Sequence, residues 1–261
     1  MRWPAAWLVI LLMAMPPASL ADALAPITGP AGAAGATDAA GAAGGAGESG
    51  QAGRVPPAPW TYAGLPNQRL PATRFAIEIV DGRPALRVET AGSYGNLIHR
   101  LGGAKAGELS WRWRVDRPLP SADLRTRQGD DVALKVCALF DMPRERVPFV
   151  ERQLLRLAEA RTREPLPNAT LCYVWDPSWP AGSLVPNAYS RRVRYLTLGS
   201  AGPGWEVVRR NLSEDFRHAF GDESAAVPAL RAVAVGADAD NTGGNSLGFV
   251  ADLELRPRPS R

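Results

Sequence analysis

The sequence predicts an all-β protein, an antiparallel sandwich or barrel with one or two short helices. Three observations predict it. Apolar and polar residues alternate with a period of two along much of the chain, proline and glycine clusters separate the alternating stretches, and no regular strand–helix–strand rhythm occurs. The composition, 46% hydrophobic and 21% charged, is that of a folded domain and not of a disordered chain.

Alternating stretches define the predicted strands. In residues 74–80, aromatic and aliphatic side chains take every second position, and Asp81-Gly82 then favours a tight hairpin. In residues 108–115, leucine, tryptophan and valine alternate with serine and charged residues, which predicts a strand with an aromatic core face. The other predicted strands are residues 85–89, 132–140, 171–175, 192–198, 205–210, 230–236 and 247–255.

Two segments have helical periodicity. Residues 148–163 carry an apolar face that we expect to pack over a sheet edge, and docking on a membrane or on a partner is the alternative. The members of that face are Val150, Leu154, Leu157 and Ala158. Residues 213–221 are expected to form a second helix, with Ser213 as its N-cap and with Phe216 and Phe220 on one face.

The chain divides into three predicted parts. Residues 1–23 have the pattern of a signal peptide, because Arg2 precedes an apolar run at 5–15 and small residues follow it. Residues 24–59 are rich in alanine, glycine and proline and are expected to be a disordered linker. Residues 60–261 are expected to form a single β-sandwich domain. The protein is therefore predicted to be periplasmic or secreted, with no transmembrane segment after signal cleavage.

The charge balance indicates which partners to exclude. Thirty basic residues against 26 acidic ones give a net charge of +4. Only Lys105 and Lys135 are lysines, and the arginines are spread along the chain instead of forming a stripe. This pattern argues against a nucleic-acid partner.

Both cysteines, Cys137 and Cys172, lie in predicted strands. If the two strands pair, a disulfide could join them, and export would permit it. The alternative is two buried free thiols that act as small apolar residues. The sequence leaves both open, and it leaves the oligomeric state open as well.

An acidic turn follows the predicted strand 230–236. Asp238, Asp240 and Asn241 crowd oxygen ligands together, and calcium is the metal that such a set suggests. The spacing opens like an EF-hand loop, but Phe249 stands where that loop needs a glutamate. The alternative is a turn in which these side chains bond their own backbone.

Aromatic and acidic residues also gather at the end of the predicted strand 171–175. Tyr173 and Trp175 share one strand face, and Asp176 and Trp179 follow in the next loop. A sugar ring stacks on flat aromatic surfaces while polar groups bond its hydroxyls, so these residues predict a saccharide site. The alternative for Tyr173 and Trp175 is the core, whereas Trp179 is expected to be exposed.

Two more residues complete the predicted ligand-binding set. Arg210 is expected to pair with a carboxylate such as Asp215 or Asp131, or else to bind an anionic ligand. Asp131 follows Asp130 where a strand begins, and neighbouring side chains in a strand point to opposite faces. A strand-end turn is therefore the favoured interpretation of this acidic pair.

Five segments in order resemble one family. They are WRWRVDRPLP at 111–120, GDDVALKVCALFD at 129–141, YVWD at 173–176, WEVVRRNLSEDFRHAFGDE at 205–223 and GADADNTG at 236–243. Over roughly residues 60–255 the chain resembles the exported bacterial family catalogued as domain of unknown function 3047. The resemblance implies an all-β, jelly-roll-like sandwich of galactose-binding-like architecture, with no assigned activity.

No catalytic signature stands out in the sequence. His99 and His218 are the only histidines, and neither a nucleophile elbow nor a phosphate loop is present. The leading hypothesis is therefore noncatalytic binding of a saccharide or a cell-envelope polymer.

Two other functions stay open. The first is a glycan hydrolase in which Asp131 and either Asp238 or Asp240 are the paired carboxylates, which would have to lie ~5–9.5 Å apart. The second is an envelope scaffold or interaction protein that docks through the helix at 148–163.

Overall fold

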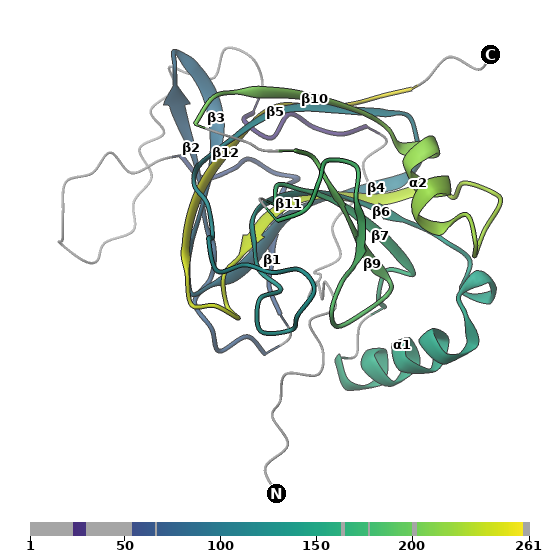
Figure 1. The fold of residues 1–261 in the computed structure, drawn as a ribbon. Helices are drawn as coiled ribbons and strands as arrows, with labels where there is room; N and C mark the ends of the chain where they lie inside the picture. Colours follow the sequence, from purple (N-terminus) through teal and green to yellow (C-terminus); the bar gives the residue numbers. More distant parts are fainter. Residues whose placement is uncertain are drawn as a thin grey trace, which may run out of the picture.

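Two β-sheets packed face to face form the body of the protein (Figure 1). The computed structural model describes residues 23–29, 54–65, 67–162, 165–176, 178–199 and 203–257. The larger sheet has the order β1 (Thr61–Ala63), β4 (Tyr94–Ala104), β11 (Leu230–Asp238), β6 (Val132–Phe140), β7 (Ala169–Val174), β9 (Val193–Thr197) and β8 (Leu184–Pro186). The smaller sheet has the order β10 (Glu206–Asn211), β5 (Glu108–Arg117), β12 (Asn245–Arg256), β3 (Arg83–Ala91) and β2 (Arg74–Val80).

This architecture confirms the predicted fold class, a jelly-roll-like β-sandwich with two short helices. Within the described residues the paired strands run antiparallel, except that β7 and β9 are parallel. Each predicted strand is present. The strands that the sequence analysis did not predict are β1, β4 and β8, because the two short ones are three residues each and β4 mixes glycine, asparagine and arginine with its apolar residues.

The space between the sheets holds the main hydrophobic core. Trp111 and Trp113 of β5 point into it and are fully buried. The ring centroid of Trp111 lies 5.2 Å from the ring centroid of Tyr173 in β7. Each large apolar side chain buried in this way contributes about 1.5–3 kcal/mol. Arg112 and Arg114 alternate with the tryptophans and pair with carboxylates on the outer face of the five-stranded sheet, as the alternation predicts.

The outer face of the seven-stranded sheet, turned away from the five-stranded sheet, is buried too. Cys137 of β6 and Cys172 of β7 are register partners on this face and form a disulfide, which resolves the alternative that the sequence left open. Leu124 packs in the same apolar cluster, so the loop of residues 118–131 covers the face. Trp179 packs against this cluster from a second loop.

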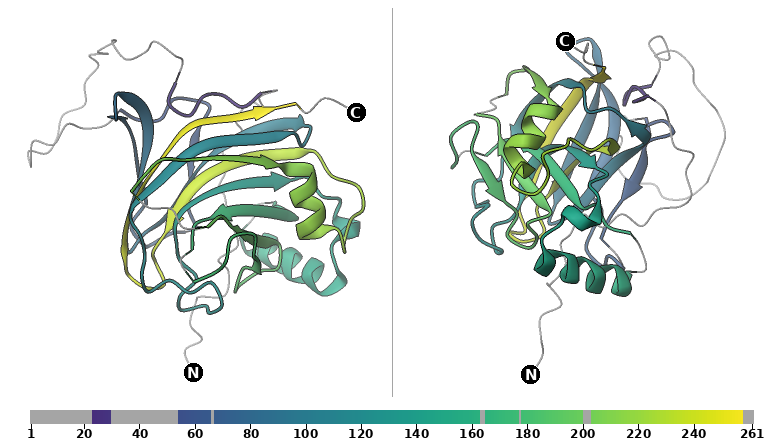
Figure 2. Two further views of the ribbon diagram at one scale, coloured as in Figure 1. Left: turned by 45° about the horizontal axis from the view of Figure 1, so that its top comes forward. Right: turned by 90° about the vertical axis from the view of Figure 1, so that its right-hand side faces the viewer.

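Both helices lie at the same end of the sandwich (Figures 1 and 2), which we call the helix end. Helix α2 (Leu212–Phe220) stacks Phe216 on Phe220 with ring centroids 5.5 Å apart, as predicted. The predicted N-cap was wrong, because the side chain of Asn211 accepts hydrogen bonds from the backbone N–H groups of Ser213 and Glu214. Asparagine caps as well as serine does, and the helix therefore begins one residue earlier than expected.

The orientation of helix α1 (Phe149–Thr162) corrects a second prediction. We expected Val150, Leu154 and Leu157 to face the sheet, yet all three are exposed. The side chains buried against the body are Leu155 and Ala158. A short 3₁₀ turn, η2 (Arg144–Arg146), precedes the helix. No helix in the described part of the chain is both long and apolar enough to cross a membrane.

Residues 23–29 pack against the domain although most of them fall in the predicted linker. Ile27 is buried in the inter-sheet core. The backbone N–H of Ala25 donates to Nε2 of His99 at 3.0 Å, and the Ala25 carbonyl accepts from Nε1 of Trp60 at 3.0 Å. A large apolar side chain and two hydrogen bonds thus order this part of the expected disordered linker. The predicted signal peptide before residue 23 and the linker from 30 to 53 lie outside the described residues.

Candidate functional site

The strand register brings the two predicted binding segments to the same end of the seven-stranded sheet. Asp238, the last residue of β11, pairs with Val132, which begins β6. Val174, the last residue of β7, pairs with Lys135 of the same β6. The turn after β11 and the loop after β7 therefore leave the sheet at one end, which we call the loop end. With β6 between them, the two strands are about 10 Å apart.

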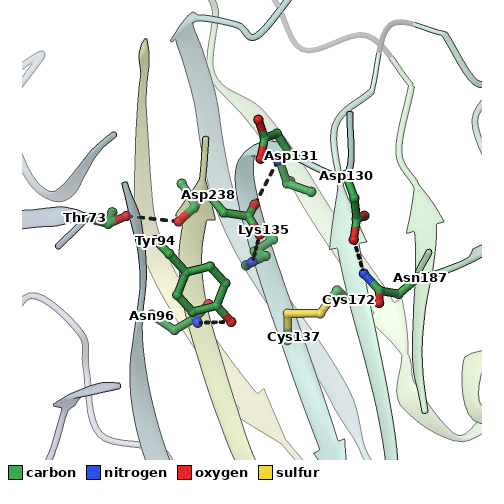
Figure 3. A network of polar contacts seen from close by, with 12 residues as sticks. Thr73, Tyr94, Asn96, Asp130, Asp131, Lys135, Cys137, Cys172, Asn187 and Asp238 are labelled. Atoms are coloured by element: carbon green, nitrogen blue, oxygen red, sulfur yellow. Dashed lines mark hydrogen bonds and ion pairs between the residues drawn. A yellow bond between two sulfur atoms is a disulfide. The ribbon is translucent and has the colours of Figure 1, made fainter. Parts of the chain in front are cut away.

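A buried ion pair is the centre of the polar cluster at this end (Figure 3). Nζ of Lys135 donates to Oδ2 of Asp238 at 3.0 Å, and the Val132 N–H donates to Oδ1 at 2.8 Å. Burial by itself lowers the pKa of Lys135, but the neighbouring side chains of Asp238, Tyr94 and Asp130 together outweigh burial, so the pKa is raised. The lysine therefore stays charged inside the protein.

Tyr94 and Asn96 of β4 close one side of this cluster. Nζ of Lys135 lies 5.1 Å from the ring centroid of Tyr94, and the amide of Asn96 donates to the Tyr94 hydroxyl at 3.3 Å. Oδ1 of Asn96 is buried and has no hydrogen-bond partner among the described residues. A Cβ atom on Gly236 would lie only 2.1 Å from this oxygen, so the close approach of Asn96 requires glycine at that position.

Asp131 braces the turn after β11. Its Oδ1 accepts from the backbone N–H and the side-chain amide of Asn241, each at 3.1 Å. Its Oδ2 accepts from the backbone N–H of Thr242 at 2.7 Å and from the Thr242 hydroxyl at 2.6 Å. Both oxygens of this carboxylate are thus used within the protein, as the turn interpretation predicts.

Asp130 accepts fewer hydrogen bonds than Asp131, the other member of the acidic pair. Its Oδ2 accepts a hydrogen bond from the side-chain amide of Asn187, while its buried Oδ1 has no partner among the described residues. Burial, followed by the nearby Asp238 charge, raises the pKa of Asp130 to about 7. The side chain is therefore close to half protonated at neutral pH.

The pKa of Asp240 is raised as well, and its side chain is more exposed than that of Asp130. It is half-buried, its Oδ1 has no partner among the described residues, and burial and the Asp238 charge raise its pKa to about 7. Asp130, Asp238 and Asp240 thus interact with one buried ammonium, that of Lys135, and Asp131 interacts with Asp238. The excess of carboxyl groups makes full ionisation costly, and perturbed carboxyl groups of this kind are typical of functional sites.

Two half-buried aromatic side chains lie at the loop end, and one of them, Tyr189, is next to the acidic cluster. The Tyr189 hydroxyl is 2.9 Å from Oδ1 of Asn241 and 2.9 Å from the carbonyl oxygen of Arg127. Trp179 is half-buried at the loop end, less exposed than we expected. Asp176 is buried and its Oδ1 accepts from the Ser178 N–H at 2.7 Å.

Three of the predicted ligand-binding residues do not join this cluster. Tyr173 and Trp175 pack against the inter-sheet core, which is the alternative that the sequence left open for them. The Tyr173 hydroxyl donates to Oδ2 of Asp215 at 2.7 Å, and Nε of Arg210 donates to the same oxygen at 2.9 Å. The expected Arg210–Asp215 pair is thus present, beside helix α2 at the helix end.

Two of the three predicted calcium ligands are engaged by other groups, and Asp240 is the third. Asp238 binds Lys135, and Oδ1 of Asn241 lies within hydrogen-bond distance of the Tyr189 hydroxyl. In the described part of the chain, no three His, Cys, Asp or Glu side chains come together as a metal ion would need. The geometry gives the calcium hypothesis no support.

Sequence analysis assigned Asp130 only to a strand-end turn, and it did not name the other members of the cluster as site residues: Tyr94, Asn96, Lys135, Asn187 and Tyr189. Lys135 carried a readable signal, because it is an isolated lysine in the apolar strand VALKVCALF, where a buried charge needs a partner. Asn187 and Tyr189 carried none, since only the folding of their loop over the sheet brings them to Asp130 and Asn241.

Comparisons with solved structures found low similarity. A family 12 xyloglucanase from Bacillus licheniformis is 8% identical with a TM-score of 0.41, and 76% of this chain covers 93% of that one. The xyloglucanase domain of NopAA, a type three effector from Sinorhizobium fredii, is 9% identical with a TM-score of 0.37, and 76% of this chain covers 96% of it. At these values the similarities carry no argument about this chain.

Comparisons of sequence gave one match. No curated protein is significantly similar to the chain. The profile of a family described as "Protein of unknown function (DUF3047)" matches residues 58–254.

Proposed function

Since the chain belongs to the DUF3047 family, whose function is unknown, we propose that it binds a saccharide or a cell-envelope polymer at the loop end without cleaving it. One observation carries the proposal. Half-buried Trp179 and Tyr189 lie at the same end of the sheet as the half-buried polar side chains of Asp240 and Asn241. Rings of this kind stack on sugar faces, and carboxyl and amide groups bond sugar hydroxyls.

The spacing of these groups suits an extended ligand. Trp179 follows β7 and Asp240 follows β11, and these strands are about 10 Å apart. Asp240 is half-buried, so the accessible part of its side chain can bond a hydroxyl of a ligand, while its Oδ1 is itself buried and has no partner among the described residues. The proposal includes export to the periplasm or the medium, on the basis of the pattern in residues 1–23.

The test is a binding assay on isolated peptidoglycan sacculi and on a soluble neutral β-glucan. We expect the wild type to bind at least one of them and Trp179→Ala to bind about tenfold more weakly. Trp205→Ala is the matched control, because Trp205 lies on the outer face of the five-stranded sheet between Arg112 and Arg114. Absence of binding by the wild type to both probes, or equal losses in the two tryptophan variants, contradicts the proposal.

Glycan hydrolysis is the second candidate function, and Asp240 is the observation that favours it. A half-buried carboxyl group with a pKa of about 7 is suited to donate a proton to a leaving oxygen. The other carboxylates named by the sequence are less suited, because Asp131 accepts four hydrogen bonds and Asp238 holds Lys135.

A reducing-end assay on the same two probes separates the candidates. Hydrolysis predicts that reducing ends appear over time and that Asp240→Asn lowers the rate by about 100-fold or more. Retention on the probe with no release of reducing ends leaves binding without cleavage as the function.

A further inference from the structure

Helix α1 presents an apolar stripe that the rest of the described chain does not cover. Phe149, Val150, Leu154 and Leu157 are 69%, 67%, 53% and 50% exposed. At 100° per residue these four positions fall within one outward arc of the helix, with Leu155 and Ala158 on the opposite, buried arc. Gln153 and Ala160 are the other exposed residues of this arc. Isolated exposed apolar residues are common, but four large ones on one arc of one helix indicate an interaction surface.

The ion pairs of α1 explain why the stripe faces outward. Glu159 pairs with Arg144 and also accepts from the Leu166 N–H at 3.0 Å. Glu151 lies 3.8 Å from the buried guanidinium of Arg192. Both carboxylates of the helix therefore turn toward the body and fix its rotation, and the apolar residues are left on the other side.

The exposed charge nearest to this arc on the helix itself is positive. Arg156 is exposed next to Phe149 at the edge of the arc, and Glu145 and Arg146 are both exposed in the turn just before the helix. No acidic side chain of α1 lies on this arc in the part of the helix whose side chains are described, because Glu151 and Glu159 point the other way. An apolar stripe flanked by arginine complements an anionic lipid surface, where the arginines meet headgroups and the apolar side chains enter the acyl boundary.

We propose that α1 docks the protein on a membrane that contains anionic lipid. The helix lies in the plane of the interface and inserts Phe149, Val150, Leu154 and Leu157. It protrudes at the helix end of the sandwich, and no other helix or strand of the described residues covers its outer side (Figure 2). A four-residue stripe on one convex helix falls short of the ~800 Å² per partner that a stable protein interface buries, whereas a bilayer adapts to its shape.

Vesicle flotation tests the proposal, with phosphatidylcholine vesicles compared with vesicles that also contain phosphatidylglycerol. We expect the wild type to float with the anionic vesicles. The double variant L154E/L157E should lower the bound fraction about tenfold or more, because it places carboxylates in the acyl boundary. Arg156→Gln should weaken binding about fivefold, and only to the anionic vesicles.

Val207→Glu is the matched control. Val207 is 65% exposed, and it lies on β10 at the edge of the five-stranded sheet and not on α1. This variant should float as the wild type does. All variants carry the same N terminus, so a difference between them reports on the helix, and circular dichroism melts confirm that each is folded.

Three results would overturn the proposal. The first is a wild type that does not float with either vesicle. The second is an L154E/L157E variant that floats as well as the wild type. The third is a wild-type dimer in light scattering that L154E/L157E converts to a monomer, because the stripe would then be covered by a second copy of the chain. Failure here leaves the saccharide proposal intact, since that site lies at the loop end.

Discussion

Two polar networks, one beside helix α2 and one at the loop end, differ in how well their charges balance. At the helix end, Arg210 donates to both oxygens of Asp215, and the Tyr173 hydroxyl donates to the same carboxylate. Each of these polar groups has a partner. At the loop end, several carboxyl groups interact with the single ammonium of Lys135, and Oδ1 atoms of Asp130, Asp240 and Asn96 lack partners among the described residues.

This difference distinguishes a network that stabilises the fold from a network that is a candidate binding site. A balanced network repays the desolvation of its members and needs no ligand, so Tyr173 and Arg210 join α2 to the sheets. An unbalanced network is costly to fold and leaves acceptors that a ligand or water could satisfy. The sequence placed residues of both networks in one binding set, and the structure places them in two separate networks.

The largest expected effect is the loss of the buried ammonium at the loop end. Lys135→Met should lower the free energy of unfolding by about 3–5 kcal/mol, because it leaves the buried Asp238 without its partner. Denaturant unfolding measures the change. The double variant Lys135→Met/Asp238→Asn should recover part of the loss, and a single variant as stable as the wild type would show that Asp238 is not charged.

A smaller loss is expected from the corresponding change at the helix end. Arg210→Met should cost about 1–2 kcal/mol in the same experiment, because the arginine side chain is partly exposed and Asp215 keeps the Tyr173 hydroxyl. Saccharide binding should be unchanged. If a folded Arg210→Met variant lost binding to the probes, Arg210 would belong to the ligand site. The distinction between the two networks would then be wrong.

The smallest expected effect is a pH dependence of stability that comes from Asp130, the carboxyl group whose Oδ1 has no partner among the described residues. The pKa of Asp130 is about 7 in the folded protein and ~3.9 in an unfolded chain, so the folded state holds an extra proton between these values. The wild type therefore loses stability as the pH rises from about 4 to 7, and above 7 the charged carboxylate stays buried at full cost. An asparagine at this position does not titrate, so Asp130→Asn removes this contribution to the pH dependence of stability.

Thermal melts at pH 5 and pH 8 test this sign. Asp130→Asn should raise Tm relative to the wild type by about 2–6 °C more at pH 8 than at pH 5. Asp131→Asn is the matched control, because it disturbs the bonds to Asn241 and Thr242 and should lower Tm at both pH values. A Tm difference for Asp130→Asn that does not change with pH would contradict the assignment of a titrating, under-satisfied carboxyl group.

The sequence alone was sufficient for the fold class and for nine of the twelve strands in the described chain, and it named Asp215 as one of two possible partners of Arg210. A period of two is a local property, and burying one face of each alternating strand requires a second layer whatever the order of the strands. The cysteine pair was also readable as an alternative, since both residues stand in strands.

Tertiary structure decided which side chains meet. The strand register set Cys137 opposite Cys172 and brought the turn at 239–244 to the same end as Trp179. The rotation of α1 depended on long-range ion pairs of Glu151 and Glu159, which outweighed the amphipathic pattern of the helix. Alternation constrains only the face of one element, whereas pairing between loops depends on the path of the whole chain, and that information is not present in any one segment.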